Sequence, residues 1–454
     1  MSLPDIQLSE PKERSSYRPS SHKFFKALKA AQPERVGEVT GVVGLSLDIA
    51  GLKCAVGDLV TLNSHPPIEA EVVAVTKTTA RCMPLGRIDG ISAGMTAQTK
   101  NASALIPTGN ALLGRVLDGL GRPIDGKGPL NASGYVSLNN ESPDAMQRSR
   151  ITEPLQTGVR VLDTLTTVGK GQRMGLFAGS GVGKSSLLSM IARGTDAQVS
   201  VIALVGERGR EVREFLEDDL GPEGLARSIV VVSTSDEPAL MRIRAAFTAT
   251  RIAESFRDAG ADVVLMMDSL TRVAMAQREI GLSVGEPPAT RGYPPSTFSV
   301  LAQLLERAGT ASTGSVTGLY TVLVDGDDHN EPVADAARSI LDGHIVLDRK
   351  LAVAGHFPAI NALGSISRVA SKVLNPGQNQ IALSLRKVMA AREQARDLID
   401  VGVYQSGTNP LVDAAIANEK TIISFLQQSM EDQTPADESW ARLTTLTHAL
   451  GVTN

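Results

Sequence analysis

A glycine-rich loop between an apolar strand and an apolar helix is the part of this sequence best suited to chemistry. The strand ends near Phe177, and Ala178-Gly-Ser-Gly-Val-Gly-Lys-Ser-Ser186 follows it. Backbone N–H groups of such a loop can surround a β-phosphate, a lysine can neutralise the β- and γ-phosphate oxygens, and a serine hydroxyl can bind Mg²⁺. The positive end of the helix dipole adds to this attraction. We predict a nucleotide-binding loop with these residues: Gly179, Ser180, Gly181, Val182, Gly183, Lys184, Ser185 and Ser186.

The first position of this loop is occupied by Ala178, where the motif usually has glycine. Alanine is compatible with the loop if its backbone φ is negative. The alternative interpretation is a glycine-rich turn with a chance lysine. The context disfavours that alternative, because the loop follows an apolar strand and precedes an apolar helical run that contains Leu187, Leu188, Met190 and Ile191.

Two acidic residues follow predicted strands further along the chain. One apolar run ends in Asp268, and another is followed by Gly206 and Glu207. Ligands of α/β sheets bind at the carboxyl ends of parallel strands. Asp268 is therefore expected to hold Mg²⁺ through water, and Glu207 to orient the water that attacks ATP. Glu207 could instead be a solvated acid in a charged turn, although that interpretation suits Glu211 and Glu214 on the following helix better.

The composition narrows the possible classes of function. A chain of 454 residues predicts roughly two to four domains. The net charge of −4 and the aromatic content of 3% give no support for nucleic-acid binding. Cys54 and Cys82 lack metal-ligand spacing and are expected to be buried thiols. The N-terminus has no apolar stretch of the kind a secretion signal needs, and no run of about 18 apolar residues occurs. We therefore expect a cytoplasmic protein, for which any role at a membrane, at its inner face, would be peripheral.

The hydrophobic pattern changes along the chain and predicts its organisation. Residues 1–35 are expected to be a flexible segment with a short amphipathic helix at 21–32, which either covers the next domain or docks on a partner or an anionic membrane. In residues 36–101, apolar and polar residues alternate over short stretches, which is the pattern of a small β-barrel. Residues 102–371 predict an α/β domain with a mainly parallel sheet, and residues 372–454 a helical domain. The sheet strands are expected near 173–177, 199–205, 229–233, 262–267, 318–324 and 344–347.

Several longer segments resemble the catalytic ATPases of type III protein export, flagellar and virulence-associated, which are similar to the catalytic β-subunit of F-type ATP synthases. The resemblance runs from about residue 36 to the C-terminus. It implies a multidomain fold with a small N-terminal β-barrel, a central RecA-like P-loop ATPase domain and a C-terminal helical domain. The segments that carry it are 112–125, 171–185, 268–279, 285–295 and 341–347.

The resemblance implies catalytic roles at matching positions. Glu207 matches the catalytic carboxylate, and Lys184 remains the phosphate ligand. Arg208 and Arg272 match arginines that face the phosphates, whereas Arg368 matches an arginine that reaches into the site of a neighbouring subunit. Phosphoryl transfer gains from such positive charges because negative charge spreads over the transferring group.

Two aromatic residues match positions that pack against the adenine ring. They are Phe357, in Gly-His-Phe-Pro, and Tyr404, in Gly-Val-Tyr-Gln-Ser-Gly. Ordinary core packing is the alternative for each. For cofactors, the resemblance implies ATP and Mg²⁺, with Ser185 and Asp268 as the metal site, Asp268 through water.

The resemblance also implies partners. It predicts a homohexamer, a regulatory stator-like protein bound to the N-terminal segment, and a central stalk-like coiled-coil protein. Export chaperones and their substrates, and a peripheral contact with the inner-membrane export gate, complete the expected set. Nucleic acid is not expected.

Alternative functions remain to be weighed against a flagellar export ATPase. Met275 and Arg291 favour the flagellar system over a virulence-type injectisome, which is the first alternative. A catalytic subunit of ATP synthase is the second. A non-catalytic nucleotide-binding scaffold is disfavoured because both Lys184 and Glu207 are present. An RNA translocase is disfavoured by the pI of about 6.0.

Overall fold

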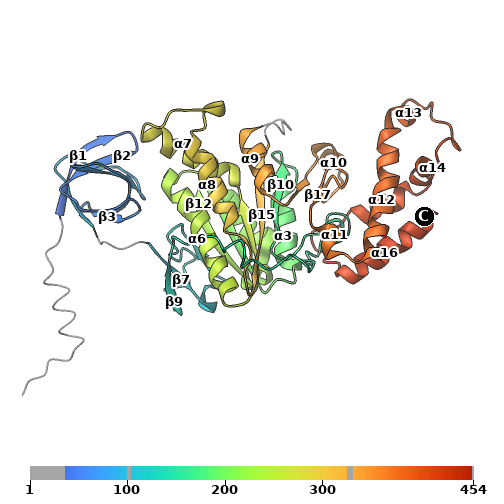
Figure 1. Ribbon diagram of the computed structural model, residues 1–454, viewed down its shortest axis with the longest axis horizontal. Helices are drawn as coiled ribbons and strands as arrows, with labels where there is room; N and C mark the ends of the chain where they lie inside the picture. Colours follow the sequence, from blue (N-terminus) through green and yellow to red (C-terminus); the bar gives the residue numbers. More distant parts are fainter. Residues whose placement is uncertain (1–35, 100–103, 325–330, 452–454) are drawn as a thin grey trace, which may run out of the picture.

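The computed structural model describes residues 36–99, 104–324 and 331–451. The helix expected at 21–32 lies outside these residues. Figure 1 shows three parts in a row, with a small barrel at one end, an α/β domain in the middle and a bundle of helices at the other end. This arrangement confirms the predicted fold class.

The N-terminal barrel is closed by six antiparallel strands in the order β1-β2-β5-β4-β3-β6. Alternate residues of its strands are buried, as Val39 in β1 and Leu47 and Ile49 in β2 illustrate. This period of two sends every second side chain inward, and closure leaves no strand edge exposed. The strands are β1 Val36–Val43, β2 Ser46–Ala50, β3 Leu59–Leu62, β4 Ile68–Val75, β5 Thr79–Pro84 and β6 Thr96–Thr99.

The central sheet has the order β17-β16-β10-β15-β13-β11-β12-β8, with β14 paired to β15. The pairs from β16 to β8 are parallel, whereas β17 and β14 pair in the antiparallel sense. Strands β7 and β9 form a separate, antiparallel two-stranded sheet. The bounds are β7 Leu105–Thr108, β8 Val116–Leu117, β9 Gly134–Ser137, β10 Arg173–Ala178, β11 Val199–Glu207, β12 Ser228–Thr234, β13 Asp262–Asp268, β14 Gly309–Thr310, β15 Ser315–Leu323, β16 Gly343–Val346 and β17 Ile366–Ser367.

Helices cover both faces of this sheet. Along β11, Val201 and Ala203 belong to one buried apolar cluster and Ile202 and Leu204 to another, so both faces of the strand are packed. Parallel strands covered on both sides are apolar throughout for this reason. The helical segments are η1 Asn110–Leu112, α2 Arg160–Thr164, α3 Lys184–Gly194, α4 Gly209–Glu214, the π-helix η2 Phe215–Leu220, α5 Gly221–Ala226, α6 Ala239–Asp258, α7 Leu270–Ser283, η3 Thr290–Gly292, α8 Pro295–Glu306, α9 Pro332–Ile340 and α10 Arg349–Val353.

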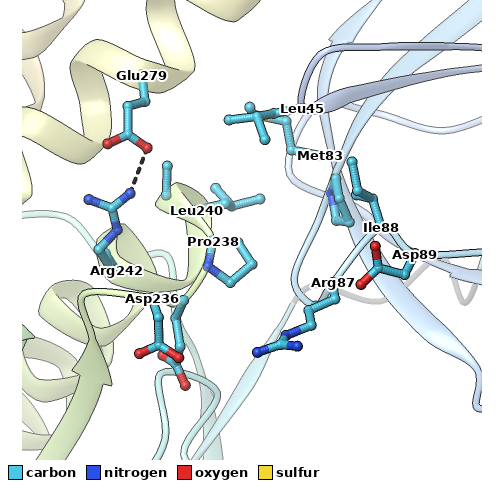
Figure 2. A pocket seen from close by; sticks show the side chains of 14 residues that line it. Leu45, Met83, Arg87, Ile88, Asp89, Asp236, Pro238, Leu240, Arg242 and Glu279 are labelled. Atoms are coloured by element: carbon cyan, nitrogen blue, oxygen red, sulfur yellow. Dashed lines mark hydrogen bonds and ion pairs between the residues drawn. The ribbon is translucent and has the colours of Figure 1, made fainter. Parts of the chain in front are cut away.

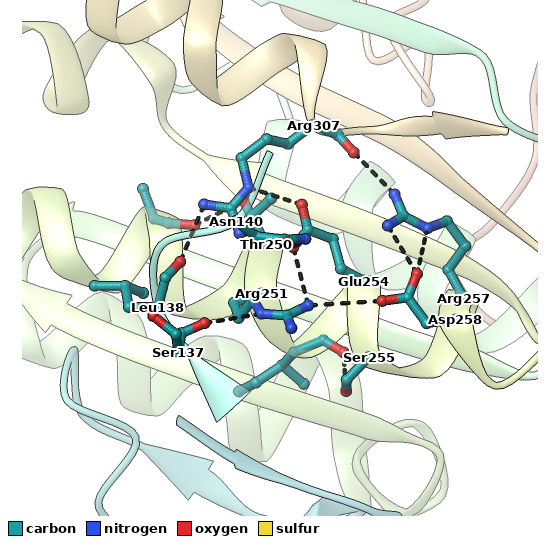
Figure 3. A network of polar contacts seen from close by, with 12 residues as sticks. Ser137, Leu138, Asn140, Thr250, Arg251, Glu254, Ser255, Arg257, Asp258 and Arg307 are labelled. Atoms are coloured by element: carbon teal, nitrogen blue, oxygen red, sulfur yellow. Dashed lines mark hydrogen bonds and ion pairs between the residues drawn. The ribbon is translucent and has the colours of Figure 1, made fainter. Parts of the chain in front are cut away.

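A buried polar network holds the C-terminal half of α6. Glu254 has no exposed surface, and Arg307, just after α8, donates two hydrogen bonds of 2.7 Å to its carboxylate. Asn140 and Arg251 donate to the same carboxylate, as Figure 3 shows. A buried carboxylate is stable only when its oxygens are satisfied in this way. The network therefore joins α6, the end of α8 and the segment after β9 into one unit.

The other end of α6 faces the barrel. Arg244 of α6 forms a 2.6 Å ion pair with Glu71 of β4, and Arg242 forms another with Glu279 of α7. A cavity of about 300 Å³ lies between barrel residues, including Ile88, and the start of α6 at Leu240 (Figure 2). Helix α6 thus contacts the barrel at one end and packs along β11, whose last residue is the predicted catalytic carboxylate.

The C-terminal helices follow the last strand of the sheet. Helix α12 begins with a capping box, in which the Asn375 side chain accepts from the Gln378 N–H and the Gln378 side chain accepts from the Asn375 N–H. It packs against α14 and α16. None of the helices in the described ranges has the length and apolar character of a bilayer span. The helices are α11 Ala370–Val373, α12 Pro376–Gln394, α13 Arg396–Asp400, α14 Pro410–Ala417, α15 Glu419–Leu426 and α16 Ala436–Ala449.

Candidate functional site

The glycine-rich loop joins the end of β10 to the start of α3. Gly181 and Gly183 have φ values of 75° and 89°, in the left-handed region that residues with a Cβ rarely adopt. Ala178 is buried at the end of β10, and among the described residues Arg291 is the one non-glycine with a positive φ. The substitution of alanine for the usual glycine therefore introduces no backbone strain.

Lys184 lies between two carboxylates. Its Nζ is 2.5 Å from Asp268 Oδ1 and 3.4 Å from Glu207 Oε1. These residues are far apart in the sequence, but β10, β15, β13 and β11 are consecutive in the sheet and their carboxyl ends share one edge. The strand-end position of Asp268 and Glu207 thus delivers both side chains to the loop.

The surroundings of this lysine and Glu207 shift their pKa values in the direction that catalysis needs. Burial lowers the pKa of Lys184, but the charges of Asp268 and Glu207 raise it by more, so Lys184 stays protonated. Burial and the negative charge of Asp268 raise the pKa of Glu207 to about 7, against the opposing effect of Lys184. A carboxylate that titrates near neutral pH is suited to proton exchange with a water molecule.

A small cavity connects the predicted metal ligands with the predicted catalytic carboxylate. Ser185, Glu207 and Asp268 line the same space of about 130 Å³. Hydroxyl and carboxylate oxygens are the ligands that Mg²⁺ prefers, and it keeps several waters when it binds beside phosphates. The donor set therefore fits Mg²⁺ at this position.

Thr321 also belongs to this site, although the sequence around it did not single it out. The residue lies near the carboxyl end of β15 and is fully buried. Its hydroxyl donates a hydrogen bond of 2.8 Å to Asp268 Oδ1. One sequence feature could have indicated Thr321, because it is a hydroxyl residue at the otherwise apolar end of β15. This strand pairs with β13, the strand of Asp268.

The arginines predicted to face phosphate differ in their surroundings. Arg208 is exposed and forms a 2.9 Å ion pair with Glu211. Arg272, in the first turn of α7, packs so closely on Gly206 that a Cβ there would lie 2.9 Å from the arginine Cβ. Its Nε is buried and has no hydrogen-bond partner. Arg272 therefore lies beside Glu207 with an unsatisfied donor, and its role towards phosphate stays a prediction.

The predicted intersubunit arginine lies on the surface. Arg368 follows β17, and its backbone N–H donates to the Asp342 carbonyl at 3.0 Å. Arg368 is exposed, and within the described part of the chain its side chain forms no hydrogen bond or ion pair. An exposed guanidinium can reach another molecule, and the intersubunit role of Arg368 stays a prediction.

The two predicted adenine-packing residues are placed differently. Phe357 is 46% exposed, and its ring carbons lie 3.5 and 3.6 Å from where a Cβ on Gly183 would be. Tyr404 follows α13 instead, where its hydroxyl donates to Asp413 Oδ1 at 3.0 Å and lines a separate cavity among α12, α13 and α14. The structure brings Phe357 to the loop and leaves Tyr404 with the C-terminal helices.

Two family models match the chain. The nucleotide-binding domain of the ATP synthase alpha/beta family matches residues 158–367, and the C-terminal domain of the type III secretion ATPase EscN matches residues 374–445. The first contains the loop, Glu207 and Asp268. The second coincides with the helical part.

Full-length relatives are similar over most of the sequence. The chain is 50% identical to the flagellum-specific ATP synthase of Bacillus subtilis, over 91% of this chain and 95% of the relative. It is 46% identical to the type 3 secretion system ATPase of Xanthomonas euvesicatoria, over 91% and 94%. Its fold is similar to the assembled ATPase EscN of enteropathogenic E. coli in complex with its central stalk EscO, with a TM-score of 0.85, 43% identity and coverage of 90% and 100%.

Proposed function

This chain belongs to the family of type III export ATPases, enzymes that hydrolyse ATP, and we propose that it serves a flagellar export apparatus. The observation that carries the enzymatic part is the convergence of Lys184, Glu207 and Asp268 on one loop. A protein that only bound nucleotide as a scaffold would not need Glu207 beside the phosphate-binding lysine.

Hydrolysis follows from the positions of these side chains. Lys184 Nζ donates to the carboxylates of Glu207 and Asp268. When ATP binds, the lysine would leave these carboxylates and bind the β- and γ-phosphates instead. Glu207, released from the lysine, orients and polarises the attacking water. Ser185 and Asp268 would hold Mg²⁺, which when bound neutralises charge on the phosphate oxygens. Arg272 and Arg208 add positive charge near the same group.

Phe357 supports the position of the nucleotide base. Its exposed ring beside Gly183 offers an apolar surface at the end of the loop. We infer that the adenine packs against this ring. Tyr404 would join it only after a movement of the C-terminal helices, because its hydroxyl is bonded within them.

The assembly is part of the proposal. The solved relative is an assembled ATPase with a central stalk, and the exposed Arg368 is suited to complete the site of a neighbouring copy. We infer a homohexamer that binds a coiled-coil stalk, export chaperones and their substrates. The regulatory stator-like protein would bind the segment 1–35, and the contact with the membrane export gate would be peripheral.

The flagellar system is favoured over the injectisome by the residues Met275 and Arg291 and by the 50% identity to a flagellar relative. The injectisome remains the second candidate, because the C-terminal helices match the EscN model. The full chain should restore motility and flagellin export in a flagellated bacterium that lacks its own flagellum-specific ATPase. Restoration of effector secretion alone, in a strain that lacks its injectisome ATPase, would favour the second candidate instead.

The enzymatic part has its own test. The purified full chain should release phosphate from ATP only when Mg²⁺ is present, and Glu207→Gln should abolish nearly all of this release. Glu217→Gln is the matched control, because Glu217 is an exposed acid of η2 that pairs with Arg213 and does not line the cavity of Glu207. Equal loss in both variants would contradict the role of Glu207.

A further inference from the structure

The buried hydroxyl of Thr321, in a central strand of the sheet, donates a hydrogen bond to a carboxylate on the neighbouring strand. Strands β13 and β15 are parallel neighbours, and Met267 pairs with Tyr320, so Asp268 and Thr321 come next to each other at the strand ends. The hydroxyl is fully buried and donates to Asp268 Oδ1 at 2.8 Å. The Met267 carbonyl, at 3.3 Å, is a weaker alternative acceptor.

The hydrogen bonds of Asp268 are unequally divided between its two oxygens. Oδ1 accepts from both Lys184 and Thr321. Within the described ranges, Oδ2 accepts no hydrogen bond, although the residue lines the cavity that Ser185 also lines. One carboxylate oxygen is therefore anchored to the protein, and the other is available to a metal-bound water.

Nucleotide binding would change the hydrogen bonds that Asp268 accepts. If Lys184 turns to the phosphates, as the proposed function requires, Asp268 Oδ1 loses its charged partner. Among the described residues, the Thr321 hydroxyl is then the donor that still bonds to Asp268 Oδ1. A group that orients a metal-binding carboxylate in this way determines how well the metal binds.

We propose that Thr321 is a positioning residue for the metal site: it fixes Asp268 through Oδ1 so that Oδ2 faces the Mg²⁺ shell beside Ser185. This inference rests on the proposed function, since it assumes that a divalent cation binds here with the nucleotide. Thr321 acts through Asp268 and does not touch the substrate.

The test uses the full chain with Mn²⁺ and ADP, so that metal binding is measured without turnover. Thr321→Val keeps the shape of the side chain and removes the hydroxyl, whereas Thr321→Ser restores it. Thr317→Val is the matched control, because Thr317 is a buried threonine of the same strand whose hydroxyl accepts from the Gly171 N–H. Electron paramagnetic resonance reports free Mn²⁺ during the titration.

The Kd of Mn²⁺ in the presence of ADP should rise roughly 10- to 100-fold in Thr321→Val, the usual cost of losing such a partner. Thr321→Ser and Thr317→Val should stay close to the wild type. ADP affinity without metal should be unchanged in all variants, which also verifies that they fold. If Thr321→Val does not fold, Thr321→Ala is compared with Thr321→Ser in the same titration.

The outcomes separate the two proposals. An unchanged Mn²⁺ affinity in Thr321→Val, or an equal loss in Thr317→Val, would overturn the positioning role. If the wild type binds Mn²⁺–ADP but does not hydrolyse ATP, the proposed function is wrong while the Mn²⁺ titration still decides the role of Thr321. If the wild type binds no Mn²⁺ with ADP, the inference fails with its premise.

Discussion

The pH dependence of ATP hydrolysis should reveal the environment of Glu207. Its pKa is raised to about 7, first by burial and then by the charge of Asp268. The water-polarising role requires the deprotonated carboxylate. Activity should therefore be present above neutral pH and fall as the pH drops through 7, well above the range in which an ordinary glutamate titrates.

The size of the effect follows from the same pKa. With a pKa of about 7, the deprotonated fraction is about nine tenths at pH 8 and slightly below one tenth at pH 6, so kcat/KM should fall about tenfold between them. The ratio kcat/KM is the appropriate quantity because it reports the pKa values of the essential acid and base of the enzyme before substrate binds.

The assay measures kcat/KM for ATP at constant free Mg²⁺ from pH 5.5 to 8.5. Glu207→Gln should be at least ~10²-fold slower, the usual scale of general-base assistance. The pH dependence of its residual activity should show the titration of ATP alone, and it therefore serves as the control for effects of pH on the substrate. A wild-type profile that is flat down to pH 5, or identical in shape to that of the variant, would refute the reasoning about burial and Asp268.

Three further perturbations test the other parts of the site and the assembly. Lys184→Ala should weaken nucleotide binding as well as turnover, measured with a fluorescent ATP analogue, whereas Glu207→Gln should bind nearly normally; equal loss of affinity in both would contradict their separate roles. Arg368→Ala should lose on the order of 10³-fold in turnover, as for other arginines delivered in trans, and wild-type activity per subunit should rise with protein concentration; full activity of the variant would exclude a shared site. Deletion of residues 2–32 should leave nucleotide binding intact and remove binding to a coiled-coil regulator; a melting temperature many degrees lower, with regulator binding retained, would instead identify the segment as structural.

Local patterns in the sequence were sufficient to predict much of the central domain. The loop from Ala178 to Ser186 is identified by glycine spacing and by the lysine and serine that open a helix, all of which are local. The six expected strands coincide with β10, β11, β12, β13, β15 and β16, because a strand buried on both faces is an uninterrupted apolar run. The short strands β8 and β17 have too few residues for such a signal.

What the sequence by itself determined is the chemistry of each candidate: which residues carry charge, which are hydroxyls, and which lie at strand ends. Only the tertiary structure decided which of them meet, because the sheet order β10-β15-β13-β11 differs from the order along the chain. That order places Thr321 beside Asp268 and both beside Lys184, and it leaves Tyr404 with the C-terminal helices. Hydrogen bonds act over about 3 Å, so their partners depend on strand neighbours that no local pattern encodes.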